Sequence, residues 1–141
     1  MTTKQIELIR ASWTLVSAID PETVGNLFYT RLFEIAPEVK PMFRNSLSEQ
    51  SKKLLTTLGY VISSLNRLDS VADDIAKLAH RHVKYGVKPV HYIAVGEALL
   101  WTLEKGLGEH WNNELKEAWS QCYSILSAAM IGVSDQAKNA A

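Results

Sequence analysis

The side chains in this sequence best suited to holding a metal are its four histidines, His80, His82, His91 and His110. A neutral imidazole is the commonest metal ligand among protein side chains, and it also exchanges protons near neutral pH. The chain has one cysteine, Cys122. We therefore expect neither a disulfide within the chain nor a zinc site built from cysteine pairs. The question is whether any of the four histidines is a metal ligand.

His82 lies on the apolar stripe of a predicted helix that ends near Gly86, whereas His80 faces the other side of that helix. Three apolar residues share the stripe at helical spacing: Val71, Ile75 and Leu78. A buried imidazole needs a partner, which is a backbone carbonyl, a water or a metal. On this pattern alone, a hydrogen-bonded core histidine is the more common explanation, and a metal ligand is the alternative. His91 and His110 lie near predicted helix starts, where we expect surface positions.

Two further polar side chains accompany apolar helix faces. Gln50 falls in the first turns of a predicted helix, with Leu54 on the same face, and Tyr29 shares a face with Gly25 and Leu32. A glutamine beside an apolar face costs free energy unless its amide has a partner. In a generic helix, a solvated edge position explains Gln50, and a core tyrosine bonded to water explains Tyr29. Gly25 and a small residue on the Gln50 helix, Ser51, would allow the two helices to cross closely.

Helical periodicity runs through the whole chain, and the strict alternation typical of strands is nearly absent. Pro21 opens one predicted helix, and Ser46 with Glu49 fits a capping box at the start of another. We expect fraying after Ile131. The predicted class is all-α, with about seven helices in one domain spanning 1–141. The predicted ranges are 4–18, 21–35, 39–43, 47–65, 70–86, 89–106 and 111–131.

Composition narrows the choice of partners. The chain has 15 Lys plus Arg and 15 Asp plus Glu, so its formal net charge is zero. No basic excess indicates nucleic acid or an anionic membrane. The N-terminus lacks the apolar segment of a secretory signal, and the apolar runs are too short to span a bilayer. We therefore expect a cytoplasmic protein.

Several residues occur in an order and spacing that resembles the globin family: Gly25, Tyr29, Pro37, Phe43, Gln50 and His82. The runs 28–33 (FYTRLF), 37–40 (PEVK) and 88–92 (KPVHY) add to this pattern. The sequence is most similar to bacterial single-domain haemoglobins and to the haem domain of flavohaemoglobins, over nearly its whole length. The resemblance implies a globin fold, with the helices packed around a pocket for haem b.

The resemblance assigns roles to individual residues. His82 would be the proximal iron ligand, with its second ring nitrogen donating to a backbone carbonyl or a nearby side chain. Phe43 would stack on the porphyrin, although plain core packing explains it equally well outside the family. Tyr29 and Gln50 would face the ligand on the distal side. Three other residues would complete the cofactor-binding set: Leu54, Tyr92 and Val95.

The Tyr29 and Gln50 donors predict tight, slowly reversible dioxygen binding. Dioxygen bound to ferrous iron carries negative charge, which donors in a dry pocket stabilise more than water does. Carbon monoxide carries less charge and gains less. We therefore expect a binding protein for storage, transport or scavenging, with no catalytic residue. The alternative is a nitric oxide dioxygenase, and a ligand sensor ranks last because no signalling domain is attached.

The sequence departs from the flavohaemoglobin pattern in two places. Nothing in it resembles a flavin or nicotinamide fold, so electrons would come from an external reductase. In that family a tyrosine and a glutamate polarise the proximal histidine. Tyr92 and Tyr123 resemble tyrosines of that region, but Ser134 falls where the glutamate is expected, which makes peroxidase-like chemistry less favourable. We expect a monomer or a small homo-oligomer.

Overall fold

The computed structural model describes the backbone of residues 1–140 and the side chains of residues 1–135. This range contains six α-helices and three short 3-10 segments, and it contains no strand. The predicted all-α class is confirmed. The elements in chain order are α1 (Thr3–Ser17), α2 (Pro21–Ile35), η1 (Pro37–Met42), α3 (Leu47–Ser63), η2 (Leu68–Val71), α4 (Ala72–Lys84), α5 (Pro89–Leu107), η3 (Gly108–His110) and α6 (Asn113–Ala140).

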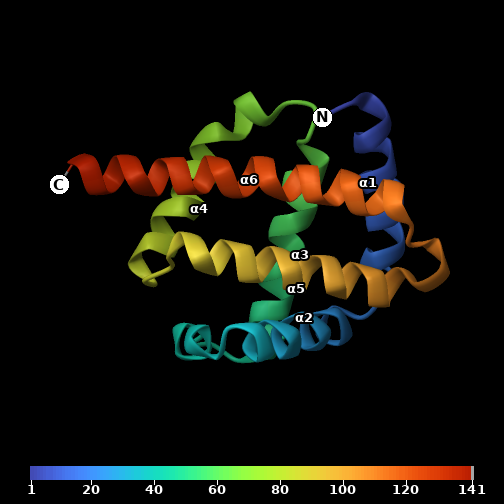
Figure 1. Ribbon diagram of the computed structural model, residues 1–141, viewed down its shortest axis with the longest axis horizontal. Helices are drawn as coiled ribbons and strands as arrows, with labels where there is room; N and C mark the ends of the chain where they lie inside the picture. The colour runs from blue at the N-terminus through green and yellow to red at the C-terminus, as the bar shows by residue number, and fades with distance from the viewer. Residues whose placement is uncertain (141) are drawn as a thin grey trace.

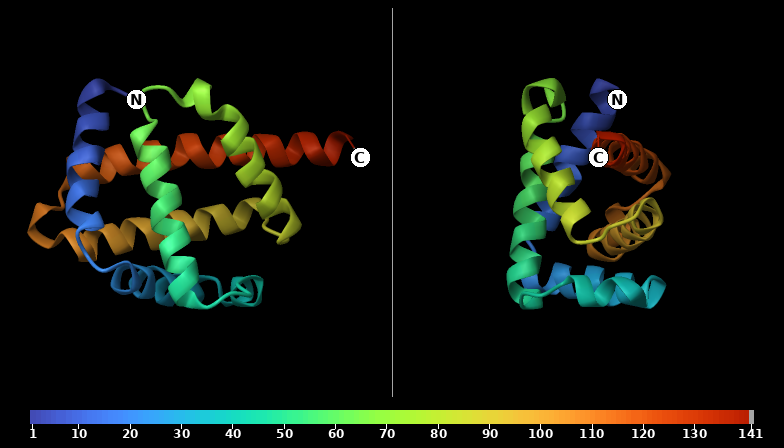
Figure 2. Two further views of the ribbon diagram at one scale, coloured as in Figure 1. Left: turned by 180° about the vertical axis from the view of Figure 1, so that it is seen from behind. Right: turned by 90° about the vertical axis from the view of Figure 1, so that its left-hand side faces the viewer.

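The helices form two layers. α5 and α6 lie antiparallel and side by side (Figure 1), and α3 and α4 lie on the other side of the molecule (Figure 2, right). α2 lies across one end and packs against both α3 and α5. α3 and α4 diverge from the connection that links them (Figure 2, left). Consequently α4 packs mainly on α6, while α3 packs mainly on α2.

Local sequence signals explain most of the helix boundaries. Pro21 occupies the first turn of α2, and Gly86 has a φ of 84° just after α4, as a left-handed helix stop requires. The Ser46 hydroxyl accepts from the Glu49 backbone N–H at 3.2 Å, so half of the predicted capping box forms. The prediction that the last helix ends near Ile131 is wrong, because α6 continues through Ala140.

α2 and α3 cross at two small residues, Gly25 and Ser51. A Cβ atom added to Gly25 would lie 3.2 Å from the Ser51 Cα and would overlap the Ser51 side chain. Ser51 is 1% exposed, and its hydroxyl donates to the Leu47 carbonyl at 2.6 Å. The close crossing expected from the sequence is therefore present, and it sets the distance between the helices that carry Tyr29 and Gln50.

The main core lies where α1, α2, α5 and α6 meet. Trp119 is 1% exposed, and its indole N–H donates to the Ser12 hydroxyl at 3.0 Å, which joins α6 to α1. Cys122 is buried in the same core, as predicted. Among the described residues, no helix combines the length and the hydropathy that a bilayer crossing requires.

Candidate functional site

His82 lies near the end of α4, half-buried on the face that also carries Leu78. Its Nδ1 atom is 2.8 Å from the Leu78 carbonyl oxygen, which can only accept a hydrogen. Nδ1 therefore carries the proton, and in the neutral ring Nε2 keeps a free lone pair. Burial lowers the pKa of His82, partly offset by the Leu78 hydrogen bond, so the neutral ring is favoured. Position, tautomer and charge all suit a metal ligand.

Aromatic rings hold the His82 imidazole in place. The Tyr92 ring on α5 stacks on it, with 6.2 Å between centroids and 24° between planes. The Tyr85 ring approaches at 6.1 Å from beyond the end of α4, a neighbour that sequence reasoning missed although it lies one helical turn from His82. The Tyr123 hydroxyl of α6 donates to the Tyr92 carbonyl at 2.6 Å. Three helices therefore fix the orientation of this ring.

Tyr92 lines a small cavity of about 210 Å3 together with Lys88, Ser134 and Asp135. Its phenol oxygen is buried and lacks a hydrogen bond of regular geometry to the side chains that the structure describes. Burial raises the pKa of Tyr92. The Ser134 hydroxyl donates to the Met130 carbonyl at 3.0 Å. Ser134 thus lies beside Tyr92, in the region where the sequence placed it, and contributes a hydroxyl there instead of a carboxylate.

Tyr29 and Gln50 come together across the crossing of α2 and α3. The Tyr29 hydroxyl donates to the backbone carbonyl of Gln50 at 3.3 Å. The contact runs through the main chain of Gln50, and its side chain is half-buried. Burial raises the pKa of Tyr29 to about 12, so the phenol keeps its proton at any physiological pH.

Phe43 packs directly against Tyr29. The two rings meet edge to face at 5.1 Å and 69°, and Phe33 contacts Phe43 at 5.6 Å. Phe43 follows η1, whose first residue, Pro37, ends the preceding helix and turns the chain. Leu54 and Val95 pack at the half-buried edge of the same apolar cluster. Four of the predicted site residues therefore surround Tyr29 or border its cluster.

The predicted site residues fall into two groups. One contains Tyr29, Phe43 and Gln50, and the other contains His82 and Tyr92. The apolar residues divide in the same way, into a large cluster around Tyr29 and a small one around Tyr92, each with half-buried members at its edge. A domain of this size usually has one contiguous core. Leu126 packs against both clusters, so they meet at one residue. His82 offers a neutral imidazole nitrogen to iron, and the half-buried apolar residues at the cluster edges suit a flat apolar cofactor, so the residues present fit a haem.

The prediction for His91 is wrong, because this side chain is 6% exposed. Its Nδ1 accepts from the Lys88 backbone N–H at 3.0 Å, and its Nε2 lies 3.9 Å from a Glu38 carboxylate oxygen. His91 thus helps to start α5, a role indicated by its place three residues after the N-cap. His80 and His110 are exposed, as predicted.

Comparison with known proteins points to a single family. The family model described as Globin matches residues 26–130. A neuroglobin from Tetraodon nigroviridis is 30% identical over 92% of this chain and 90% of its own length. A flavohaemoprotein from Bacillus subtilis is 28% identical over 92% of this chain, but the match covers only 33% of the flavohaemoprotein.

A solved structure gives the same result for the fold. A bacterial globin from Campylobacter jejuni superposes with a TM-score of 0.84 and 26% identity, over 98% of this chain and 99% of that one. The chain belongs to the globin family. Membership implies a protein that binds haem and, through it, a gas ligand.

Proposed function

We propose that this globin binds dioxygen reversibly and with high affinity, on a haem b held by His82 beneath Tyr29 and Gln50. The observation that carries the proposal is the 3.3 Å contact between the Tyr29 hydroxyl and the Gln50 backbone. It brings a buried phenol donor next to the main chain of Gln50, in the first turn of α3. The dioxygen ligand and the haem b type are the parts of this proposal that go beyond family membership.

His82 supports the cofactor from the proximal side. When bound, haem supplies the iron atom to which a gas ligand attaches and from which the ligand gains negative charge. The Leu78 carbonyl oxygen accepts a hydrogen bond from Nδ1 at 2.8 Å, so Nε2 is the nitrogen available to iron. Tyr92 restricts rotation of the ring by stacking on it. Fixing both the tautomer and the orientation increases the affinity of a histidine for its metal.

Tyr29 and Gln50 would stabilise the charge that develops on the ligand. A phenol and a primary amide both donate hydrogen bonds, and a hydrogen bond to a charged group contributes about 1.5–3 kcal/mol. Burial of Tyr29 keeps water out of competition with its hydroxyl, while the Gln50 amide is half-buried. The 3.3 Å bond from Tyr29 to the Gln50 carbonyl is long for an O–H donor, so exchanging it for a bond to the ligand costs little.

Reconstitution with haem tests this proposal. We expect the purified chain to take up one haem and to change its visible spectrum reversibly when dioxygen is added and removed. His82→Gly should lose haem affinity, and added imidazole should restore the spectrum by occupying the vacated space. His80→Gly, on the exposed side of the same helix, is the matched control. If His82→Gly bound haem with an unchanged spectrum, His82 would not be the iron ligand.

A second function, nitric oxide dioxygenation, is supported by the flavohaemoprotein relatives, which are 28% and 29% identical to this chain. The chain spans about a third of their length, 33% and 34%. An external reductase would then supply electrons. Adding excess nitric oxide to the dioxygen-loaded protein distinguishes the two functions. Sustained consumption with a reductase and NADH supports the enzyme, whereas a single turnover that leaves oxidised protein supports the carrier.

A further inference from the structure

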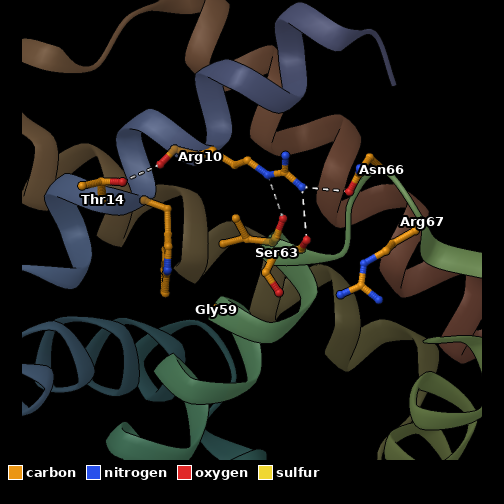
Figure 3. A pocket seen from close by; sticks show the side chains of 8 residues that line it. Arg10, Thr14, Gly59, Ser63, Asn66 and Arg67 are labelled. Carbon is orange, nitrogen blue, oxygen red and sulfur yellow. Dashed lines mark hydrogen bonds between the residues drawn. The ribbon is translucent and has the colours of Figure 1, made fainter. Parts of the chain in front are cut away.

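A shallow groove runs between α1 and the second half of α3, away from the residues proposed to hold haem (Figure 3). Its volume is about 500 Å3, which is enough for a small organic molecule. α1 forms one wall, α3 forms the floor, and the segment after α3 closes one end. The lining residues are Arg10, Trp13, Thr14, Gly59, Ile62, Ser63, Asn66 and Arg67.

The groove carries positive charge. Arg10 and Arg67 line it, and no Asp or Glu does. Neither arginine forms an ion pair among the described residues. Asp74 accepts a hydrogen bond from the Tyr60 hydroxyl at 2.6 Å and is not part of the lining. In a chain with zero net charge, this local excess favours an anionic ligand.

Arg10 is held in position with donors to spare. Its Nε donates to the Ile62 carbonyl at 3.3 Å, and its Nη2 donates to the Ser63 carbonyl at 3.2 Å and to the Asn66 side chain at 3.0 Å. These bonds use three of the five guanidinium hydrogens and leave those on Nη1. Arg67 extends back toward Ser63 from the other side (Figure 3). A planar carboxylate is the anion that arginine donors match best.

Trp13 supplies the apolar surface of the groove. Its half-buried indole lies against Gly59 of α3: a Cβ atom added to Gly59 would be in ordinary van der Waals contact with the indole, 3.6 Å from Nε1 and 3.9 Å from Cζ2. The part of this indole that lines the groove favours a planar aromatic body over a bulky one.

Two hydroxyl groups on the groove point to a further feature of the ligand. The Thr14 hydroxyl already donates to the Arg10 carbonyl at 3.0 Å, and the Ser63 hydroxyl donates to the Tyr60 carbonyl at 2.8 Å. Since each hydroxyl has one hydrogen, both can only accept from a ligand. They therefore suit a ligand that carries its own O–H or N–H donor.

We infer that this groove is a binding site for a small aromatic carboxylate that also bears a hydroxyl or amine. The carboxylate lies at the Arg10 and Arg67 end, and the ring lies against the groove-lining face of Trp13. The site does not involve the proposed haem pocket. Its test therefore does not depend on the outcome of the haem experiments.

Titration of the full chain with 4-hydroxybenzoate tests the site. Binding is followed by calorimetry and by the NMR signal of the Trp13 indole N–H, with 4-hydroxybenzamide as the neutral analogue. Arg67→Gln removes one exposed cation from the groove, and Arg44→Gln, which removes an exposed cation elsewhere, is the matched control. Gly59→Leu, which would displace the Trp13 indole, is a second, independent variant, and its folding is checked by circular dichroism.

We expect 4-hydroxybenzoate to shift the Trp13 signal and the amide to bind at least about tenfold more weakly, since one charge-assisted bond is lost. Arg67→Gln should weaken carboxylate binding by a similar factor, and Arg44→Gln should not. Gly59→Leu should abolish binding. An unshifted Trp13 signal at millimolar 4-hydroxybenzoate would overturn the inference. Equal affinities for wild type and Arg67→Gln would do so as well.

Discussion

The Tyr29 hydroxyl on α2 donates to the backbone carbonyl of Gln50 on α3, across 3.3 Å. The bond lies close to the point where Gly25 and Ser51 let the two helices cross. Because Tyr29 is 3% exposed, its phenol has no access to bulk water in place of this partner. Tyr29 therefore takes part both in the packing of α2 on α3 and in the hydrogen bonding proposed for the distal side of the haem.

Burial of Tyr29 predicts a loss of stability in alkali. Burial raises the pKa of Tyr29 from its ordinary value of 10.0 to about 12, so folding favours the protonated phenol. The contribution of Tyr29 to the free energy of unfolding is fully present below pH 10.0 and is lost as the pH rises toward 12. The full loss amounts to about 2–3 kcal/mol. Urea unfolding of wild type and Tyr29→Phe between pH 8 and 11.5 measures it. Parallel pH profiles for the two proteins would contradict this prediction.

The close crossing of α2 and α3 predicts that Gly25→Ala is destabilising. The added Cβ would overlap Ser51, and overpacking of this kind typically costs about 1–3 kcal/mol. Ser51→Gly should recover part of the loss in the double variant, because it removes the overlapping side chain. Gly132→Ala in α6 is the control, since nothing lies within 4 Å of the added Cβ and the helix should gain roughly 0.5–1 kcal/mol. Thermal unfolding of wild type, Gly25→Ala, the double variant and Gly132→Ala measures these changes in stability.

Cys122 should be an unreactive thiol. Burial raises its pKa to about 11, so almost no thiolate exists at neutral pH, and the residue is only 7% exposed. Labelling with a disulfide reagent at pH 7.5 should proceed only as fast as the protein opens, and much faster in denaturant. Rapid labelling of the folded chain would contradict the burial of Cys122.

The sequence was enough to predict much of the fold. Proline and glycine signals placed the start of α2 and the end of α4, because these residues restrict the backbone locally. The end of α6 was not predictable in the same way. Its last turns contain Ala, Lys and Asn, which read as a frayed tail, and no glycine or proline stops the helix there.

The site was partly predictable for a similar reason. His82 and Leu78 are neighbours along one helix, so their contact follows from helical spacing alone. The stacking of Tyr92 on His82, the burial of His91 beside Glu38 and the route of the Tyr29 bond through the Gln50 backbone join different elements. Such contacts depend on how helices cross, which spacing along one chain segment does not determine.

The rate at which dioxygen leaves the reduced, haem-loaded protein tests the central claim most directly. Stopped-flow displacement by carbon monoxide would compare wild type with Tyr29→Phe and Gln50→Leu, using Tyr60→Phe, a half-exposed tyrosine on α3 that bonds Asp74, as control. The account predicts slow release in wild type and in Tyr60→Phe. It predicts release at least about tenfold faster in Tyr29→Phe or Gln50→Leu, since each donor contributes about 1.5–3 kcal/mol. Rapid release in wild type, unchanged by either substitution, would contradict the proposed distal pocket.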